Sequence, residues 1–194
     1  MTIAFVVGNG VSRQLVDLSA LKTHGKIYGC NALYRDFTPD VLVSTDKPIS
    51  DTIQQTGYAV KNCMYTRTPK PGLGALVIPQ PYFGFSSGPA ALALASVAEH
   101  TVIYIIGFDM GPTKNGTFNN VYADTEFYKK SSSVPTYTGN WARQMAQIMQ
   151  QNRKKNFIRV SGPTTAPVQE FAKVSNLAHI PVDEFLRWVS NNQL

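Results

Sequence analysis

An apolar segment near the N-terminus breaks abruptly into a glycine-rich turn, and this junction constrains the fold more than any other feature. Residues 3–7 read Ile-Ala-Phe-Val-Val, and residues 8–12 read Gly-Asn-Gly-Val-Ser. The apolar run is typical of a buried strand, and glycines allow the backbone to turn sharply beside a ligand. The junction therefore predicts a nucleotide-binding turn after the first strand of an α/β protein. The dinucleotide fingerprint is incomplete, because Arg13 stands where its third glycine would be, and no P-loop lysine follows.

Strand-like runs alternate along the chain with helical ones. This alternation predicts the α/β class: a single Rossmann-like domain over residues 1–194, with a mostly parallel sheet flanked by helices. The expected strands are residues 2–7, 26–30, 41–45, 62–66, 75–78, 101–106 and 157–160. A first short helix is expected after an N-cap at Ser12 or Asp17. Further helices are expected over residues 50–55, 90–99 and 182–189, and another is expected after an N-cap at Asn140.

Composition limits the partners and the compartment. The chain of 194 residues carries a net charge of +6, which favours an anionic ligand such as a nucleotide or a nucleotide sugar. No apolar run is long enough to predict a membrane helix, so we expect no membrane partner. The two cysteines are too few for a disulfide framework, and we expect reduced thiols in a bacterial or virus-infected cytoplasm. A homo-oligomer is compatible with these features.

Residues 111–139 form a long polar stretch that contains glycine, lysine and several aromatic residues. A loop of this length in a compact domain is usually functional, and we expect a lid or a flexible loop. Three of its tyrosines, Tyr122, Tyr128 and Tyr137, are candidates to contact a phosphate.

Polar clusters fall at predicted carboxyl ends of strands or at the start of a helix, where open parallel sheets bind their ligands. A Ser-Ser-Gly helix start is also suited to a phosphate or a carboxylate. The residues expected to bind a nucleotide or a sugar donor are Gly8, Asn9, Gly10, Ser12, Asn31, Ser86, Ser87 and Gly88. The carboxylates expected to take part in chemistry are Asp46 and Asp109.

These residues also have ordinary structural roles, which the sequence leaves open. Asn9 is suited to a left-handed turn, and Ser12 is suited to a helix N-cap. Cys30 is expected to pack as a small apolar side chain, and His179 is the histidine retained as an acid–base candidate.

Taken together, the motifs resemble the family-42 bacterial sialyltransferases, which open with G-N-G-P-S and then D-x-S-x-L. The resemblance lies within residues 1–110 and consists of short motifs. The matching segments are residues 8–12, 17–21, Cys30-Asn31, Ser87-Gly88 and 105–109. The resemblance implies a Rossmann-like domain that binds a cytidine-monophosphate sugar without a metal cofactor.

Residues 39–46 read Pro-Asp-Val-Leu-Val-Ser-Thr-Asp. This segment is more similar to a group of enzymes related to the sialyltransferases than to the sialyltransferases themselves. The motility-accessory-factor glycosyltransferases and the archaeal hydroxymethyldihydropterin diphosphokinases carry Pro-Asp, a hydrophobic run and Asp here. Val11 replaces the proline of the sialyltransferases, and residues 137–141 lack their catalytic histidine. Asp46 stands where the sialyltransferases have an asparagine. A carboxylate at this position would repel the donor phosphate unless a cation lies between the two groups.

Three functions remain after this comparison. The first is a glycosyltransferase-like enzyme for a nucleotide-activated sugar, with Asp46 or Asp109 as the base. The second is a diphosphokinase or nucleotide-processing enzyme in which both aspartates hold Mg²⁺ with substrate phosphates. The third is a non-catalytic binding or structural protein, for example of a viral particle, that retains the fold.

Overall fold

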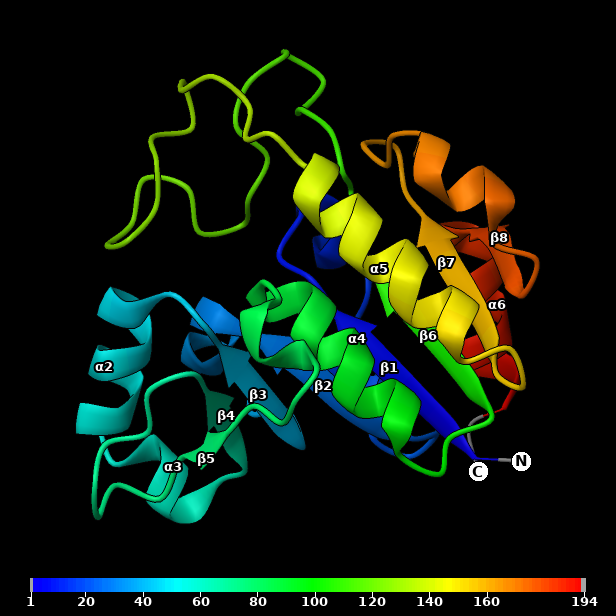
Figure 1. Ribbon diagram of the computed structural model, residues 1–194. Helices are drawn as coiled ribbons and strands as arrows, with labels where there is room; N and C mark the ends of the chain where they lie inside the picture. The colour runs from blue at the N-terminus through cyan, green and yellow to red at the C-terminus, as the bar shows by residue number, and fades with distance from the viewer. Residues whose placement is uncertain (1, 193–194) are drawn as a thin grey trace.

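The computed structural model describes residues 2–192, which form one eight-stranded sheet flanked by helices (Figure 1). The order of strands is β5-β4-β3-β2-β1-β6-β7-β8, and every pairing of neighbours is parallel within residues 2–192. The strands are β1 Ile3–Val7, β2 Lys26–Cys30, β3 Val41–Ser44, β4 Met64–Thr66, β5 Leu76–Val77, β6 Val102–Ile106, β7 Asn156–Ser161 and β8 Leu177–Pro181. The α/β prediction is confirmed.

The strand order reverses at β1. The chain runs outward from β1 through β2 to β5 and then returns to place β6 on the other side of β1. Val7 at the end of β1 is paired with Ile106 at the end of β6, so the loops that follow these two strands start side by side. Such a switch point is where open α/β sheets bind ligands.

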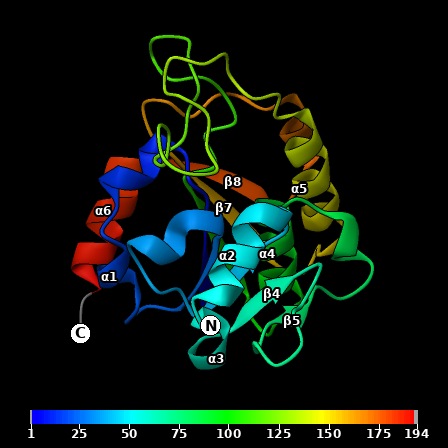
Figure 2. The same ribbon diagram turned by 90° about the vertical axis from the view of Figure 1, so that its left-hand side faces the viewer.

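Helices cover both faces of the sheet (Figures 1 and 2). One face packs against α4 and α5, and the other packs against α1, α2 and α6. The helices are α1 Leu18–Leu21, α2 Lys47–Gln55, α3 Tyr58–Lys61, α4 Ser87–Val97, α5 Gly139–Gln151 and α6 Val182–Asn191. Short 3₁₀ helices are η1 Val11–Leu15, η2 Asn31–Arg35, η3 Tyr82–Gly84 and η4 Gln169–Lys173.

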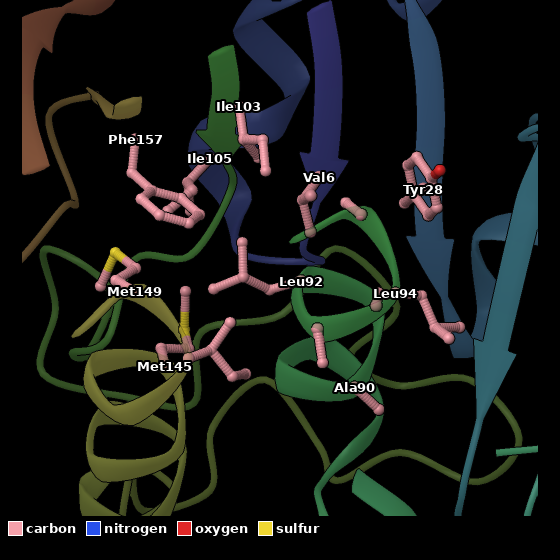
Figure 3. Packing of buried hydrophobic residues seen from close by; sticks show 14 of the residues in the cluster. Val6, Tyr28, Ala90, Leu92, Leu94, Ile103, Ile105, Met145, Met149 and Phe157 are labelled. Carbon is pink, nitrogen blue, oxygen red and sulfur yellow. The ribbon is translucent and has the colours of Figure 1, made fainter. Parts of the chain in front are cut away.

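Helix α4 lies in the centre of its layer, and its alanines explain how it fits there. Ala90, Ala91, Ala93 and Ala95 are all fully buried. Small side chains allow the helix to approach both the sheet and α5 at close-packed density. Figure 3 shows Leu92 of α4 between Val6 and Ile105 of the sheet and Met145 of α5. This packing fixes the start of α4 against the carboxyl edge of the sheet.

The structure departs from the sequence predictions at several elements, and helix α4 is one of them: it runs over Ser87–Val97 and not over residues 90–99. Helix α2 starts at Lys47, not at residue 50, because Asp46 is its N-cap and Pro48 fits the first turn. Thr138 is the N-cap of α5, so the prediction of Asn140 was wrong. Helix α3 and strand β8 were not predicted. Strand β8 is an edge strand with exposed side chains, so it lacks the apolar run of a buried strand.

Residues 111–138 form no helix or strand, as the sequence predicts. The segment connects β6 to α5 and passes over the carboxyl ends of the strands (Figures 1 and 2). We call it the overlying loop. Within residues 2–192, no helix has the length and apolar character needed to cross a membrane.

Candidate functional site

A pocket of about 200 Å³ lies at the switch point, between the strand ends and the overlying loop. Of the residues predicted to bind a donor, those that line it are Gly8, Asn9, Gly10, Asn31, Ser86, Ser87 and Gly88. Both predicted carboxylates, Asp46 and Asp109, also line it. The fold thus brings these predicted residues together although they lie far apart in the sequence. Gly8 and Asp109, for example, are 101 positions apart.

The two glycines of the first turn are required by the packing of the strand ends. The amides of Gly8 and Gly10 donate to the carbonyls of Ile106 and Gly107, both at 2.8 Å. A Cβ at Gly10 would lie 2.6 Å from Cγ of Asp109, closer than real Cβ contacts allow. The G-N-G motif therefore has a structural cause: the turn after β1 packs directly on the end of β6.

Asp109 is the centre of a buried hydrogen-bond network. Its carboxylate accepts from the backbone amide and the hydroxyl of Ser12 and from Nδ2 of Asn119 at 3.1 Å. It also accepts from Thr164 at 2.8 Å and from Thr165 at 3.4 Å. Asp109 is 3% exposed, and these donors occupy both of its oxygens. Ser12 is outside the pocket lining, and its side chain positions Asp109.

Asn9 presents an acceptor that no protein group satisfies. Its Nδ2 donates to the carbonyl of Cys30 at 3.0 Å, which fixes the side chain. Its Oδ1 is buried and has no hydrogen-bond partner within residues 2–192. An unsatisfied buried acceptor costs about 1–3 kcal/mol, so the position favours a ligand that donates a hydrogen bond. Burial raises the pKa of the Cys30 thiol to about 12, which keeps it protonated and unsuited to act as a nucleophile.

Asn31 and Ser87 join the ends of β2 and β3 to the start of α4. Oδ1 of Asn31 accepts from the hydroxyls of Ser44 and Ser87, both at 3.0 Å. The amide of Thr45 donates to Oγ of Ser87 at 2.9 Å. Asn31 has a φ of 49°, a left-handed conformation that asparagine tolerates better than most residues. These contacts hold two strand ends and one helix start in fixed positions around the pocket.

Two helix N-termini open onto the same pocket. Ser86, Ser87 and Gly88 at the start of α4 line it, and Pro89 beside them has no N–H. The amides of Ser87 and Gly88 thus remain as the first donors of α4, because the side chain of the N-cap Ser86 does not bond them. Thr138, the N-cap of α5, also lines the pocket. Two positive helix ends at one pocket favour an anion.

Aromatic side chains form part of the pocket wall. Phe108, Phe118 and Trp141 all line it. A Cβ at Gly88 would lie 2.7 Å from Cε1 of Phe108, so glycine allows this ring to lie against the start of α4. Sequence patterns do not identify Trp141 or Phe118 as pocket residues, because helical periodicity indicates a core position for Trp141 and nothing in a polar loop distinguishes Phe118. Flat apolar walls beside an anion site are suited to a nucleobase.

Asp46 differs from Asp109 in its surroundings. It is exposed, it is the N-cap of α2, and its side chain makes no capping hydrogen bond. No hydrogen bond to its carboxylate is formed in the part of the chain that the structure describes. Asp46 is therefore the carboxylate of the pocket that is free to accept a proton or a hydrogen bond from a ligand.

The overlying loop is fastened to the first turn through Asn119. Its Oδ1 accepts from the amide of Val11 at 2.9 Å, while its Nδ2 donates to Asp109. The amide of Val121 donates to the carbonyl of Asn9 at 2.7 Å. Asn119 also lines the pocket, and a single asparagine in a polar loop gives no sequence signal for this role.

The three candidate tyrosines of the overlying loop are not among the residues that line the pocket. Tyr122 donates to Asp36 at 2.6 Å, and Tyr128 accepts from the amide of Ala32 at 3.3 Å. Burial raises the pKa of both phenols. Tyr137 is 70% exposed, and its neighbours in sequence, Thr136 and Thr138, line the pocket.

His179 lies on β8, opposite Arg159 of β7, and is outside the residues that line this pocket. No group of three or more histidine, cysteine, aspartate or glutamate side chains within residues 2–192 is arranged to hold a metal ion.

The fold and the site together define an α/β protein with a polar pocket at the switch point of a parallel sheet. Comparisons of the chain with protein-family models, with curated proteins and with solved structures gave no match.

Proposed function

We propose that the pocket binds the nucleotide of a nucleotide-activated sugar, and that the protein is a glycosyltransferase-like enzyme. One observation carries the proposal: the N-termini of α4 and α5 open onto the same pocket as the buried, unpartnered Oδ1 of Asn9. The helix ends favour a phosphate, and Asn9 favours a hydroxyl or amino group held next to it.

The pocket offers a partner for each part of such a ligand. The amides of Ser87 and Gly88 are placed to donate to the phosphate. A ribose hydroxyl or an exocyclic amino group donates to Asn9, and the base lies against Phe108 or Trp141. Cytidine monophosphate is the nucleotide implied by the resemblance of the motifs, and the net charge of +6 attracts any of these anions.

Asp46 is the proposed general base. The acceptor hydroxyl gives its proton to the Asp46 carboxylate while its oxygen forms a bond to the anomeric carbon. The bond from that carbon to the donor phosphate breaks, and its electron pair leaves with the phosphate. The amides at the start of α4 stabilise the negative charge that develops there.

A magnesium-dependent diphosphokinase is favoured less. That function requires both aspartates as ligands of Mg²⁺, and the oxygens of Asp109 already accept five hydrogen bonds. Nucleotide binding that is lost in a chelator would support it over the glycosyltransferase. Nucleotide binding without any sugar transfer would instead indicate a binding protein that retains the fold.

Calorimetric titration with cytidine monophosphate tests the proposal, with uridine and adenosine monophosphates and inorganic phosphate as comparisons. Asn9→Ala should weaken nucleotide binding, whereas Asn156→Ala, at the opposite end of the sheet, should leave it unchanged. Asp46→Asn should retain binding and abolish transfer from a cytidine-monophosphate sugar. Absence of binding by every nucleotide would overturn the proposal.

A further inference from the structure

A second hollow, of about 340 Å³, lies at the β7–β8 edge of the sheet, next to the segment that connects β7 to η4. Its lining includes Arg159, Ser161, His179 and Phe171, and contains no acidic side chain. Arg159 and His179 are direct partners in the parallel pairing of β7 and β8, and Ser161 is two residues after Arg159. These three polar side chains therefore project from the same face of the sheet.

Arg159 is a buried cation whose hydrogen bonds all go to backbone carbonyls, one of them that of Asp109 at 3.4 Å, and the negative charge of Asp109 also acts on it. It is 2% exposed, and its guanidinium donates to the carbonyls of Ala166 at 2.9 Å and Phe108 at 2.8 Å. Its Nε has no hydrogen-bond partner within residues 2–192. A buried guanidinium normally pairs with a carboxylate or a phosphate, because its charge is costly to remove from water.

The remaining lining supplies donors and an apolar wall. The hydroxyl of Ser161 forms no hydrogen bond in the described part of the chain, and His179 is exposed to solvent. Partial desolvation of the ring, followed by the charge of Arg159, lowers the pKa of His179, so its imidazole is neutral at neutral pH and has one N–H to donate. Phe171 lies with its ring 5.3 Å from Cζ of Arg159.

We propose that this hollow is a binding site for an oxyanion group, a carboxylate or a phosphate, carried by an organic molecule. The anion lies against Arg159 and accepts from Ser161 and His179, and the body of the ligand packs on Phe171. The hollow of about 340 Å³ is roughly ten times the ~30 Å³ share of one water molecule, which leaves room for such a body. The site is separate from the nucleotide pocket and does not depend on its proposed function.

Backbone-amide NMR spectra test the site, using benzoate, phenyl phosphate and inorganic phosphate at millimolar concentration and constant ionic strength. Benzoate and phenyl phosphate should give saturable shifts at residues 159–172 and 177–180. Ser161→Ala and His179→Ala should each weaken binding about tenfold, the effect of one hydrogen bond to a charged group. Ser131→Ala, in the overlying loop, should leave binding unchanged.

Three results would overturn the proposal. One is the absence of saturable shifts with all three probes. Another is binding that Ser161→Ala and His179→Ala both leave intact. The third is a set of shifts confined to the nucleotide pocket. A preference for benzoate over phenyl phosphate would identify the carboxylate as the group recognised, and the reverse would identify the phosphate.

Discussion

The backbone amide and the hydroxyl of Ser12 both donate to the carboxylate of Asp109. This pair connects the turn after β1 to the end of β6, across 97 positions of sequence. The walls of the switch-point pocket on either side of β1 and β6 are therefore fixed relative to each other before any ligand binds.

Loss of the Asp109 carboxylate should destabilise the whole domain. Asp109→Ala leaves the buried donors of Ser12 and the half-buried Nδ2 of Asn119 unpaired, and an unpaired buried donor costs about 1–3 kcal/mol. We expect the free energy of unfolding in urea to fall by about 3 kcal/mol or more. Asp46→Ala, at an exposed position of the same pocket, should change it by no more than about 0.5 kcal/mol. Equal effects of the two variants would contradict the structural role of Asp109.

A methyl group at Gly88 should obstruct nucleotide binding. Its Cβ would lie 2.7 Å from Cε1 of Phe108, so the ring must shift within the pocket that it lines. We expect Gly88→Ala to weaken binding of cytidine monophosphate about tenfold in calorimetry. Gly84→Ala is the matched control, because a Cβ there meets no atom within 4 Å. If the two variants bind alike, the nucleotide does not lie beside Phe108.

The two cysteines should differ strongly in their reactivity. Cys63 is exposed, whereas Cys30 is buried with its pKa raised to about 12. Near neutral pH, a chromogenic disulfide reagent should label one thiol in the native chain and two in denaturant. Partial desolvation of its sulfur raises the pKa of Cys63 as well, so its labelling should accelerate as the pH rises. Rapid native labelling of Cys30 would contradict its burial in the pocket wall.

His100 should make stability depend on pH on the acid side of neutrality. Burial, followed by the charges of Lys155 and Lys26, lowers the pKa of His100 from its ordinary value of 6.5. Above this value the imidazole is neutral in both the folded and the unfolded chain. As the pH falls below 6.5, His100 takes up a proton in the unfolded chain before it does so in the folded chain. The free energy of unfolding therefore decreases until the pH reaches the pKa of His100 in the folded chain.

Urea unfolding at a series of pH values would measure this loss. His100→Gln should flatten the dependence below pH 6.5, although His179, whose pKa is also lowered, contributes a remaining slope in the same direction. An imidazole pKa of His100 above 6.5 by NMR would contradict the prediction.

The sequence predicted seven of the eight strands in the described chain, and it placed at strand ends most of the polar residues that line the pocket, because both follow from local patterns. Apolar runs indicate buried strands, and polar residues directly after them lie at one edge of a parallel sheet. The roles of Asp109 and Ser12 could not be predicted in this way. Their interaction depends on β6 pairing with β1, and Thr164 and Thr165 complete it from a loop after β7.

Trp141 illustrates a second limit. Its helical spacing indicates a core residue, and the structure places it in the pocket wall because α5 begins at the carboxyl edge of the sheet. Strand β8 was missed for another reason: its exposed side chains lack the apolar run that indicates a buried strand, and only its pairing with β7 defines it.

Trp141 also offers the most direct test of the central claim, that the pocket binds a nucleotide. The chain has two tryptophans, and Trp188→Phe in α6 leaves Trp141 as the remaining fluorophore. In this background, cytidine monophosphate should change the Trp141 fluorescence saturably, and the change should weaken in Asn9→Ala and persist in Gly84→Ala. A fluorescence signal that cytidine, uridine and adenosine monophosphates all leave unchanged, together with no heat of binding, would contradict the account.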